Sequence, residues 1–166
     1  PNRPLFDRVI QATYPPASPW KLATAAMGLR RGLVTMDTRM RTPCTGGFQF
    51  GNRNFCCWKR DGGHGSLTLS QAIATSCDVY FYTMGRRLGI DSLAATARLF
   101  GFGRPTGVDL APEKVGTVPS PEWSQAVRKH AWYPGETISV AIGQGPLLVS
   151  ALQTARAFAG IANADG

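Results

Sequence analysis

A serine and a lysine three residues apart, Ser18 and Lys21, are the residues of this sequence best suited to chemistry. They lie where an apolar, helix-like segment begins, and residues three apart on a helix share a face. A serine hydroxyl is a weak nucleophile until a neighbouring base takes its proton, and a neutral lysine amine can do so. The Ser-x-x-Lys spacing therefore predicts a serine that becomes acylated, with Lys21 as its activating group.

The same segment also has a purely structural interpretation. Ser18 is a typical helix N-cap, Pro19 suits the first helical position, and Lys21 would then lie solvated on the first turn. The two roles are compatible, because a helix N-terminus places backbone N–H groups beside the serine and favours developing negative charge. Residues further along the chain are needed to decide between them.

A second polar motif, Ser76-Cys77-Asp78, leads into the aromatic run Tyr80-Phe81-Tyr82. In order along the chain, these motifs resemble the transpeptidase domain of class B penicillin-binding proteins, and within that family the cell-elongation type, penicillin-binding protein 2. The resemblance covers essentially the whole chain. It is carried by the segments 14–21, 63–65, 76–82, 101–110 and 142–145.

The resemblance implies a role for each of four residues. Ser18 is then the acylated nucleophile and Lys21 its activator, while Ser76 helps to relay protons and Asp78 supports the hydrogen bonds around the lysine. The structural alternative for Ser76 and Asp78 is helix capping. The implied reaction is DD-transpeptidation, in which the serine attacks the penultimate D-alanine carbonyl of a peptidoglycan stem peptide. β-Lactams would acylate the same serine.

Two positions beside the nucleophile depart from the family pattern. The family usually has glycine where Ala17 stands, and threonine or serine where Pro19 stands. Neither change removes a catalytic group, and proline is sterically acceptable in the first turn of a helix. We expect these residues to affect the rate or antibiotic sensitivity more than the type of reaction.

The third family motif, Lys-Thr/Ser-Gly on a strand, does not occur in this sequence. We therefore expect residues 1–166 to form a C-terminally truncated transpeptidase domain of α/β (α+β) class, with the penicillin-binding-protein and serine β-lactamase fold. It should contain the helix-rich part, with a loop and hairpin subregion at 35–65, and lack most of the central antiparallel sheet. Two rival functions are a DD-carboxypeptidase or β-lactamase-like hydrolase, and a non-catalytic, zinc-stabilised structural or partner-binding fragment.

Four cysteines, Cys44, Cys56, Cys57 and Cys77, and the nearby His64 form a second group of reactive residues. Three thiolates and one imidazole suit a tetrahedral zinc ion, although the spacing matches no standard zinc finger. An even number of cysteines outside the cytoplasm also suggests disulfides. From the residues alone, a disulfide, a metal site and buried free thiols all remain open.

The resemblance favours the metal. Elongation-type relatives place aspartate, histidine and cysteine ligands for a structural zinc ion at the corresponding positions. Here the ligands would be Cys44, Cys57, His64 and Cys77, with the first two in place of aspartates, and Cys56 would be left over. Such a closed site is structural and leaves no position for a catalytic water. No organic cofactor is expected.

Hydrophobic periodicity predicts helices at 18–31, 67–88, 90–100 and 150–163. In the segment 47–55, apolar and polar residues alternate around a Gly-Asn pair that is typical of a turn. This pattern predicts a hairpin. We interpret Trp58 and the aromatic run 80–82 as packing groups rather than a ligand box.

The formal net charge is +8, but the basic residues are scattered and no nucleic-acid-binding motif accompanies them. We expect a solvated basic surface and no nucleic-acid partner. The resemblance implies a periplasmic or outward-facing domain at the cytoplasmic (inner) membrane, whose membrane anchor lies outside this chain. It also implies a membrane-embedded glycosyltransferase as partner of the parent protein.

Overall fold

The computed structural model describes residues 5–110 and 112–163. This part of the chain is mainly helical and has one two-stranded sheet. The elements in chain order are α1 (Arg8–Gln11), α2 (Trp20–Arg30), β1 (Gly47–Phe50), β2 (Arg53–Cys56), α3 (Leu69–Ala74), α4 (Asp78–Leu99), α5 (Pro121–Trp123), the π-helix η1 (Ser124–Arg128), α6 (Pro134–Val140) and α7 (Ala151–Ala162).

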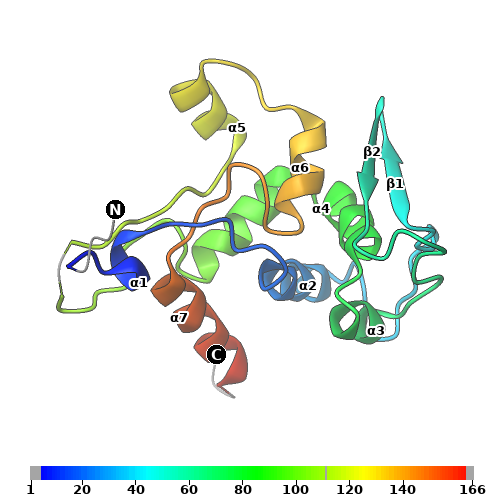
Figure 1. Cartoon of the computed structure of the whole chain (residues 1–166), viewed down its shortest axis with the longest axis horizontal. Coiled ribbons are helices and arrows are strands. Elements are labelled where there is room, and N and C mark those ends of the chain that lie inside the picture. The colour runs from blue at the N-terminus through cyan, green and yellow to red at the C-terminus, as the bar shows by residue number, and fades with distance from the viewer. Residues whose placement is uncertain (1–4, 111, 164–166) are drawn as a thin grey trace.

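The long helix α4 lies at the centre of the molecule and packs against both α2 and α6 (Figure 1). Glycines allow these helices to approach closely. A Cβ at Gly28 of α2 would lie 2.8 Å from the Met84 sulfur of α4, and one at Gly85 would overlap the Ala141 side chain just after α6. The largest hydrophobic core forms around the first half of α4, where Phe81 and Met84 are fully buried. This packing fixes the N-terminus of α4 relative to α2.

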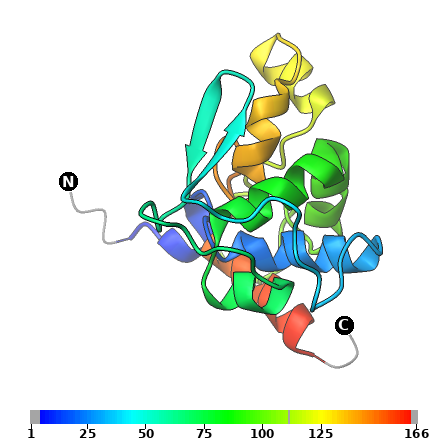
Figure 2. The ribbon, with the colours of Figure 1, turned by 90° about the vertical axis from the view of Figure 1, so that its right-hand side faces the viewer.

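The predicted hairpin is confirmed. Strands β1 and β2 pair antiparallel from Gly47 opposite Cys56 to Phe50 opposite Arg53, and the Gly-Asn turn lies between them. Phe48 and Phe55 turn their rings toward Tyr82 of α4, with ring centroids 5.9 and 5.7 Å away. Figure 2 shows the hairpin standing beside the helices with its turn projecting outward. The hairpin thus anchors the loop region 35–65 to the central helix.

The prediction of one continuous helix at 67–88 is wrong. The structure has two helices there, because Ser76 adopts a left-handed φ of 51° and interrupts the hydrogen bonds between α3 and α4. A second break, at Gly89 with φ 76°, separates residues 78–88 from the rest of α4. That break agrees with the predicted boundary between 67–88 and 90–100. The predicted helix at 150–163 is observed as α7, with Ser150 as its N-cap.

The helix predicted from Ser18 begins two residues later, at Trp20. Its N-cap is Pro19, and no side chain caps it, so the capping role considered for Ser18 is not observed. The Ser18 side chain is exposed. The structural interpretation of Lys21 is also wrong, because this residue is buried, with 3% of its surface exposed.

Isolated pairs of extended residues outside the sheet join segments that are far apart in the sequence. Tyr14 bridges Val149, so the segment leading to Ser18 runs beside the residues that precede α7. Cys44 bridges Gly65 through two backbone hydrogen bonds, which close the base of the loop that carries the hairpin. None of the helices in residues 5–110 and 112–163 combines the length and apolar character needed to cross a membrane.

An ion pair joins η1 to α6. The two terminal NH2 groups of Arg128 donate to the Glu136 carboxylate. The same guanidinium lies over the rings of Trp123 and Trp132, 5.0 and 5.4 Å from their centroids. The hydrogen bonds from Arg128 hold the pKa of Glu136 below its ordinary value. A partly buried, bidentate pair of this kind is worth about 1 kcal/mol.

This pair predicts a pH dependence of stability. Because the Glu136 pKa is lowered on folding, its contribution is fully present above the unfolded pKa and is lost as pH falls through the folded value. Between about pH 7 and pH 3, the free energy of unfolding should therefore fall by about 1 kcal/mol more in the wild type than in Glu136→Gln. Urea unfolding of both proteins along this pH series is the measurement. An equal change of the free energy of unfolding with pH in both proteins would contradict the prediction.

Candidate active site and metal centre

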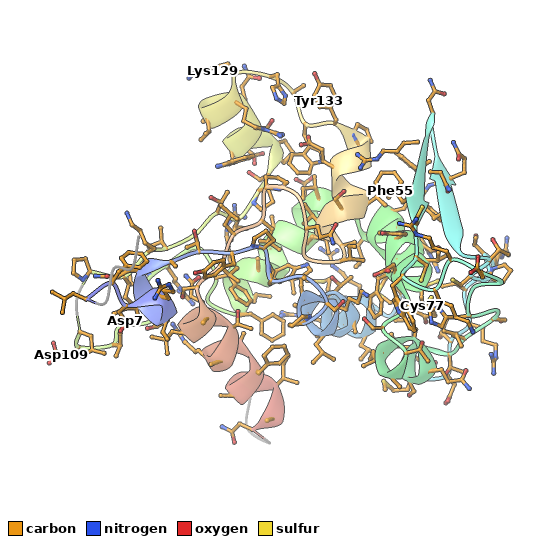
Figure 3. All side chains as sticks on the ribbon, in the orientation of Figure 1. Asp7, Phe55, Cys77, Asp109, Lys129 and Tyr133 are labelled. Carbon is orange, nitrogen blue, oxygen red and sulfur yellow. The ribbon has the colours of Figure 1, made fainter. Side chains whose placement is uncertain are left out.

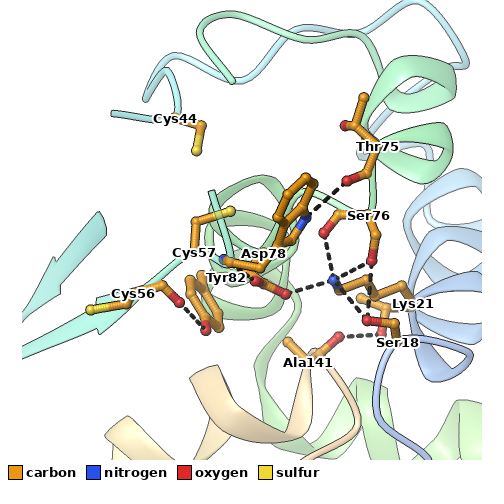
Figure 4. Close-up of polar contacts among 12 residues, drawn as sticks. Ser18, Lys21, Cys44, Cys56, Cys57, Thr75, Ser76, Asp78, Tyr82 and Ala141 are labelled. Atoms are coloured by element: carbon orange, nitrogen blue, oxygen red, sulfur yellow. Dashed lines mark hydrogen bonds and ion pairs between the residues drawn. The ribbon is translucent and has the colours of Figure 1, made fainter. Parts of the chain in front are cut away.

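The structure brings together the four residues predicted to do the chemistry (Figure 4). The Lys21 amine, from the first turn of α2, lies 3.3 Å from the Ser18 hydroxyl, 2.9 Å from the Ser76 hydroxyl and 2.6 Å from the Asp78 carboxylate. It also donates to the Ser76 carbonyl at 2.8 Å. The Ser76 hydroxyl in turn donates to the Ser18 hydroxyl at 3.1 Å. One lysine amine therefore joins both motifs.

The residues of this group differ in their exposure to solvent. The side chains of Lys21 and Asp78 are 4% and 13% exposed, whereas Ser18 lies at the surface. A buried ion pair keeps its geometry only when further hydrogen bonds satisfy it, and both partners here have them. The amine is thus held rigidly behind a hydroxyl that an incoming substrate can reach.

Two residues of this site, Ala17 and Ser76, have left-handed backbone conformations. Ala17, just before the nucleophile, has φ 53°, and Ser76 has φ 51°. Side chains other than glycine rarely adopt this conformation, which costs about 1 kcal/mol or more. The usual glycine of the family at position 17 would avoid that strain. The Ala17 N–H donates to the Gly143 carbonyl at 2.9 Å, and this bond holds the turn in place.

Gly143 is the point where the 142–145 segment touches the nucleophile turn. A Cβ there would overlap the Ala17 carbonyl oxygen and lie 2.6 Å from the Trp20 Cβ, and the backbone φ is +76°. We expect Gly143→Ala to displace the turn that carries Ser18, to reduce acylation of Ser18 and to lower the free energy of unfolding by about 1–3 kcal/mol. Thermal unfolding and labelling by a fluorescent penicillin measure the two effects.

Gly160→Ala is the matched control. A Cβ at this position in α7 has no atom within 4 Å. The substitution should leave labelling unchanged and stabilise the helix slightly, by up to about 1 kcal/mol. Equal penicillin labelling and equal stability of the two variants would contradict the role given to Gly143.

The predicted metal ligands also converge. The ligand atoms of Cys44, Cys57, His64 and Cys77 all lie within 4.8 Å of one another. The three cysteines are buried, and none of them forms a disulfide. Cys44 reaches this point from the loop before β1, Cys57 from the residue after β2, and Cys77 from the N-cap of α4. The three cysteines thus come from three separate segments of the chain.

Two distances within the cluster match an edge of a tetrahedral zinc site. Bonds of about 2.3 Å to sulfur and 2.0–2.1 Å to nitrogen require a sulfur-to-nitrogen edge of about 3.6 Å. The His64 Nδ1 atom lies 3.6 Å from the Cys44 sulfur and 3.5 Å from the Cys57 sulfur. Cys56 is exposed and takes no part, since neighbouring residues of an extended strand point to opposite sides.

The electrostatic surroundings of the thiols differ. Burial raises the pKa of the Cys77 thiol to about 12 and also raises the pKa of Cys57. Burial opposes ionisation of Cys44 too, but hydrogen bonds from the backbone of His64 and Gly46 and from neighbouring thiols lower its pKa overall. Without a metal, Cys77 therefore keeps its proton at neutral pH, and a metal must displace that proton to bind.

Sequence reasoning missed the position of Trp58, which was interpreted as a packing group. Its side chain is 64% exposed. Its backbone N–H donates to Asp78 Oδ2 and its indole N–H to the Thr75 carbonyl, each at 3.0 Å. The one signal in the sequence was its place directly after the predicted ligand Cys57.

Comparisons with known proteins identify the family to which the chain belongs. Residues 1–165 match the family described as "Penicillin binding protein transpeptidase domain". The chain is 43% identical to the peptidoglycan D,D-transpeptidase MrdA of Acinetobacter baumannii, over 98% of this chain and 24% of that protein. It is 40% identical to the MrdA protein of Salmonella typhimurium, again over 98% of this chain and 26% of the relative.

Solved structures show the same fold. The structure of Pseudomonas aeruginosa PBP2 in complex with WCK 5153 aligns with a TM-score of 0.91 and 40% identity, over 97% of this chain and 36% of that one. PBP2 of Helicobacter pylori, in a complex with MreC, aligns with a TM-score of 0.85 over 91% of this chain and 28% of that one. The chain spans about a quarter of the length of the curated relatives it matches. These matches confirm the predicted fold, and the chain belongs to the penicillin-binding protein transpeptidase family.

Proposed function

We propose that this chain supplies the nucleophile and the second motif of a peptidoglycan DD-transpeptidase. The observation that carries the proposal is the contact of one buried amine, that of Lys21, with both the Ser18 and the Ser76 hydroxyls. A serine that lies just before the helix carrying its base, and that contacts a second hydroxyl from across the site, has the parts needed to form an acyl-enzyme. Family membership supports the same reaction.

In the proposed reaction, the Lys21 ammonium first gives a proton to the Asp78 carboxylate, 2.6 Å away, and the resulting neutral amine takes the proton of Ser18 as the hydroxyl attacks a carbonyl carbon. Ser76, in contact with both groups, passes a proton on to the leaving amine. Asp78 holds the Lys21 amine in position through their 2.6 Å contact. The Ser18 N–H then serves as one donor to the developing oxyanion. The resulting ester transfers its acyl group to an amine.

The substrate we propose is a peptidoglycan stem peptide ending in D-alanyl-D-alanine. The test is release of D-alanine from such a pentapeptide, with a peptide ending in L-alanine as control. The sequence contains no Lys-Thr/Ser-Gly strand, which in the family supplies the second oxyanion donor. Without that donor, release should be slower by about a hundredfold to a thousandfold than in relatives that contain the motif. Release that persists unchanged in Ser18→Ala would contradict the proposal.

Adding a D-amino acid as amine acceptor separates transfer from hydrolysis. A transpeptidase should form the exchanged peptide at the expense of the free tetrapeptide. Free tetrapeptide alone, at any acceptor concentration, would support the rival DD-carboxypeptidase reaction. The non-catalytic alternative predicts neither product and no Ser18 adduct.

We also propose that the Cys44, Cys57, His64 and Cys77 cluster binds Zn²⁺. The donor set supports zinc, since three thiolates with one imidazole form a closed, soft site that holds structural zinc in other proteins. Bound there, the ion would join the loop that carries the hairpin to the N-terminus of α4. It would take no part in the acyl transfer.

The relatives suggest a cellular setting. The MrdA proteins are named as peptidoglycan transpeptidases, and PBP2 of Helicobacter pylori is described in a complex with MreC. A further similar structure is described as a peptidoglycan synthase complex that coordinates polymerization and crosslinking. We propose that the parent protein of this chain acts in cell-wall elongation and cell shape, on the outer face of the cytoplasmic membrane, together with a membrane glycosyltransferase.

A further inference from the structure

Trp58 lies at the junction between the metal cluster and the catalytic group. It follows the ligand Cys57 directly, and its ring meets that of His64 edge-on, with centroids 5.1 Å apart. Most of Trp58 faces solvent, yet its backbone N–H donates to Asp78 of the second motif and its indole N–H donates to Thr75, just before that motif. An exposed tryptophan held by two hydrogen bonds is fixed in place rather than packed into a core.

The two bonds from Trp58 reach Thr75, the residue before Ser76, and Asp78, two residues after it. The indole N–H donates to the Thr75 carbonyl, and the backbone N–H donates to Asp78 Oδ2. Ser76 lies between these points in a left-handed conformation that its own side chain does not favour. Two bonds from outside the α3–α4 junction therefore help to hold that conformation.

Ser76 and Asp78 supply three of the four oxygen contacts of the Lys21 amine, through the Ser76 carbonyl, the Ser76 hydroxyl and Asp78 Oδ1. The carboxylate is bound at both oxygens, one by Lys21 and the other by Trp58. If Trp58 releases Oδ2, the carboxylate is free to rotate about its side-chain bonds. The amine would then lose its fixed position beside Ser18.

We propose that Trp58 is a positioning residue for acylation, which sets Asp78 and Ser76 against Lys21 and links their position to the metal-binding loop. This inference rests on the proposed function. Trp58 does not touch the reacting atoms. Its effect should therefore appear in the rate of the chemical step, whereas the concentration of penicillin needed for half-saturation should change little.

Three variants separate the two bonds. Trp58→Phe and Trp58→Ala keep the backbone N–H but lose the indole donor, whereas Trp58→Pro removes the backbone N–H as well. We expect the limiting acylation rate to fall about threefold to tenfold in Trp58→Phe and Trp58→Ala. In Trp58→Pro, which also loses a bond to a charged group, we expect a fall of about tenfold to a hundredfold.

Tyr133→Ala is the matched control for loss of an exposed aromatic ring. Tyr133 is 59% exposed, and Figure 3 shows it well separated from Cys77 of the second motif. This variant should acylate at the wild-type rate. A fall in rate equal to that of Trp58→Ala would overturn the inference, because the effect would then not depend on the place of the ring.

Amide hydrogen exchange tests the inference without catalysis. In the wild type the Trp58 amide should be protected, and Asp78→Ala should speed its exchange about tenfold or more, because the acceptor is removed. Trp58→Phe should speed exchange of the Ser76 and Cys77 amides, which close the end of α3 through bonds to Ile73 and Ala72. Trp58→Phe carries this test even if Trp58→Pro does not fold.

The outcomes distinguish the two proposals. If the wild type forms no Ser18 adduct, the proposed function fails for this chain, and the exchange rates alone decide whether Trp58 holds the second motif. If the wild type is acylated but Trp58→Phe and Trp58→Ala match it in both rate and exchange, the role of Trp58 is refuted. Slower acylation together with faster exchange at residues 76 and 77 would support it.

Discussion

Replacing Lys21 by methionine should abolish measurable acylation of Ser18 and also destabilise the fold. The amine is the one base within reach of the Ser18 hydroxyl among the described residues, and a general base contributes about a hundredfold to ten-thousandfold to rate. Methionine also leaves the Asp78 carboxylate, 13% exposed, without its counter-ion. Breaking a buried ion pair from one side costs about 3–5 kcal/mol. Penicillin labelling and urea unfolding measure the two losses.

Lys21→Arg is the control that separates charge from catalysis. Arginine keeps the positive charge beside Asp78 but does not lose its proton in proteins, so it cannot act as a base. We expect this variant to recover part of the lost stability and none of the acylation. Acylation of Lys21→Met or Lys21→Arg at the wild-type rate would contradict the role of Lys21 in activating Ser18.

Replacing Cys77 by serine should have the largest effect on metal content. Cys77, the N-cap of α4, is one of the four proposed ligands, so its replacement would remove both a thiolate and the proposed link between the metal and the second motif. Structural zinc contributes to folding free energy directly, and we expect stability to fall by several kcal/mol. Metal analysis of the purified protein and thermal unfolding with and without a chelator provide the measurements.

Cys56→Ser is the matched control, because it changes an exposed cysteine outside the cluster. It should keep one zinc ion per chain and the wild-type unfolding temperature. Acid should release zinc from the wild type, since thiolate ligands regain their protons as pH falls. Full zinc content in Cys77→Ser, or equal stability with and without chelator, would contradict the proposed site.

Much of this arrangement was accessible from the sequence because it depends on local spacing. Ser18 and Lys21 are near in the chain, and one helical turn brings them together. The hairpin follows from alternation and a Gly-Asn turn. The convergence of the cysteines with His64 was expected from the family resemblance, whereas the residues alone left disulfide, metal and free thiols open.

Other features depend on tertiary contacts that no local pattern reveals. The left-handed Ser76 divides a continuous helical pattern, and it is held by Lys21 from α2. The short elements α5, η1 and α6 were not predicted, since each is too short for a clear period, and η1 is stabilised by the Arg128–Glu136 pair. Trp58 was assigned to packing because its two acceptors lie 17 and 20 residues further along the chain.

The most direct test of the account is the intact mass of the purified chain after incubation with a fluorescent penicillin. We expect a single adduct of one penicillin per chain, located on the peptide that contains Ser18 and absent from Ser18→Ala. It would be contradicted by a folded, zinc-loaded wild-type chain that gains no mass. An adduct that persists in Ser18→Ala would contradict it equally, since another residue would then be the nucleophile.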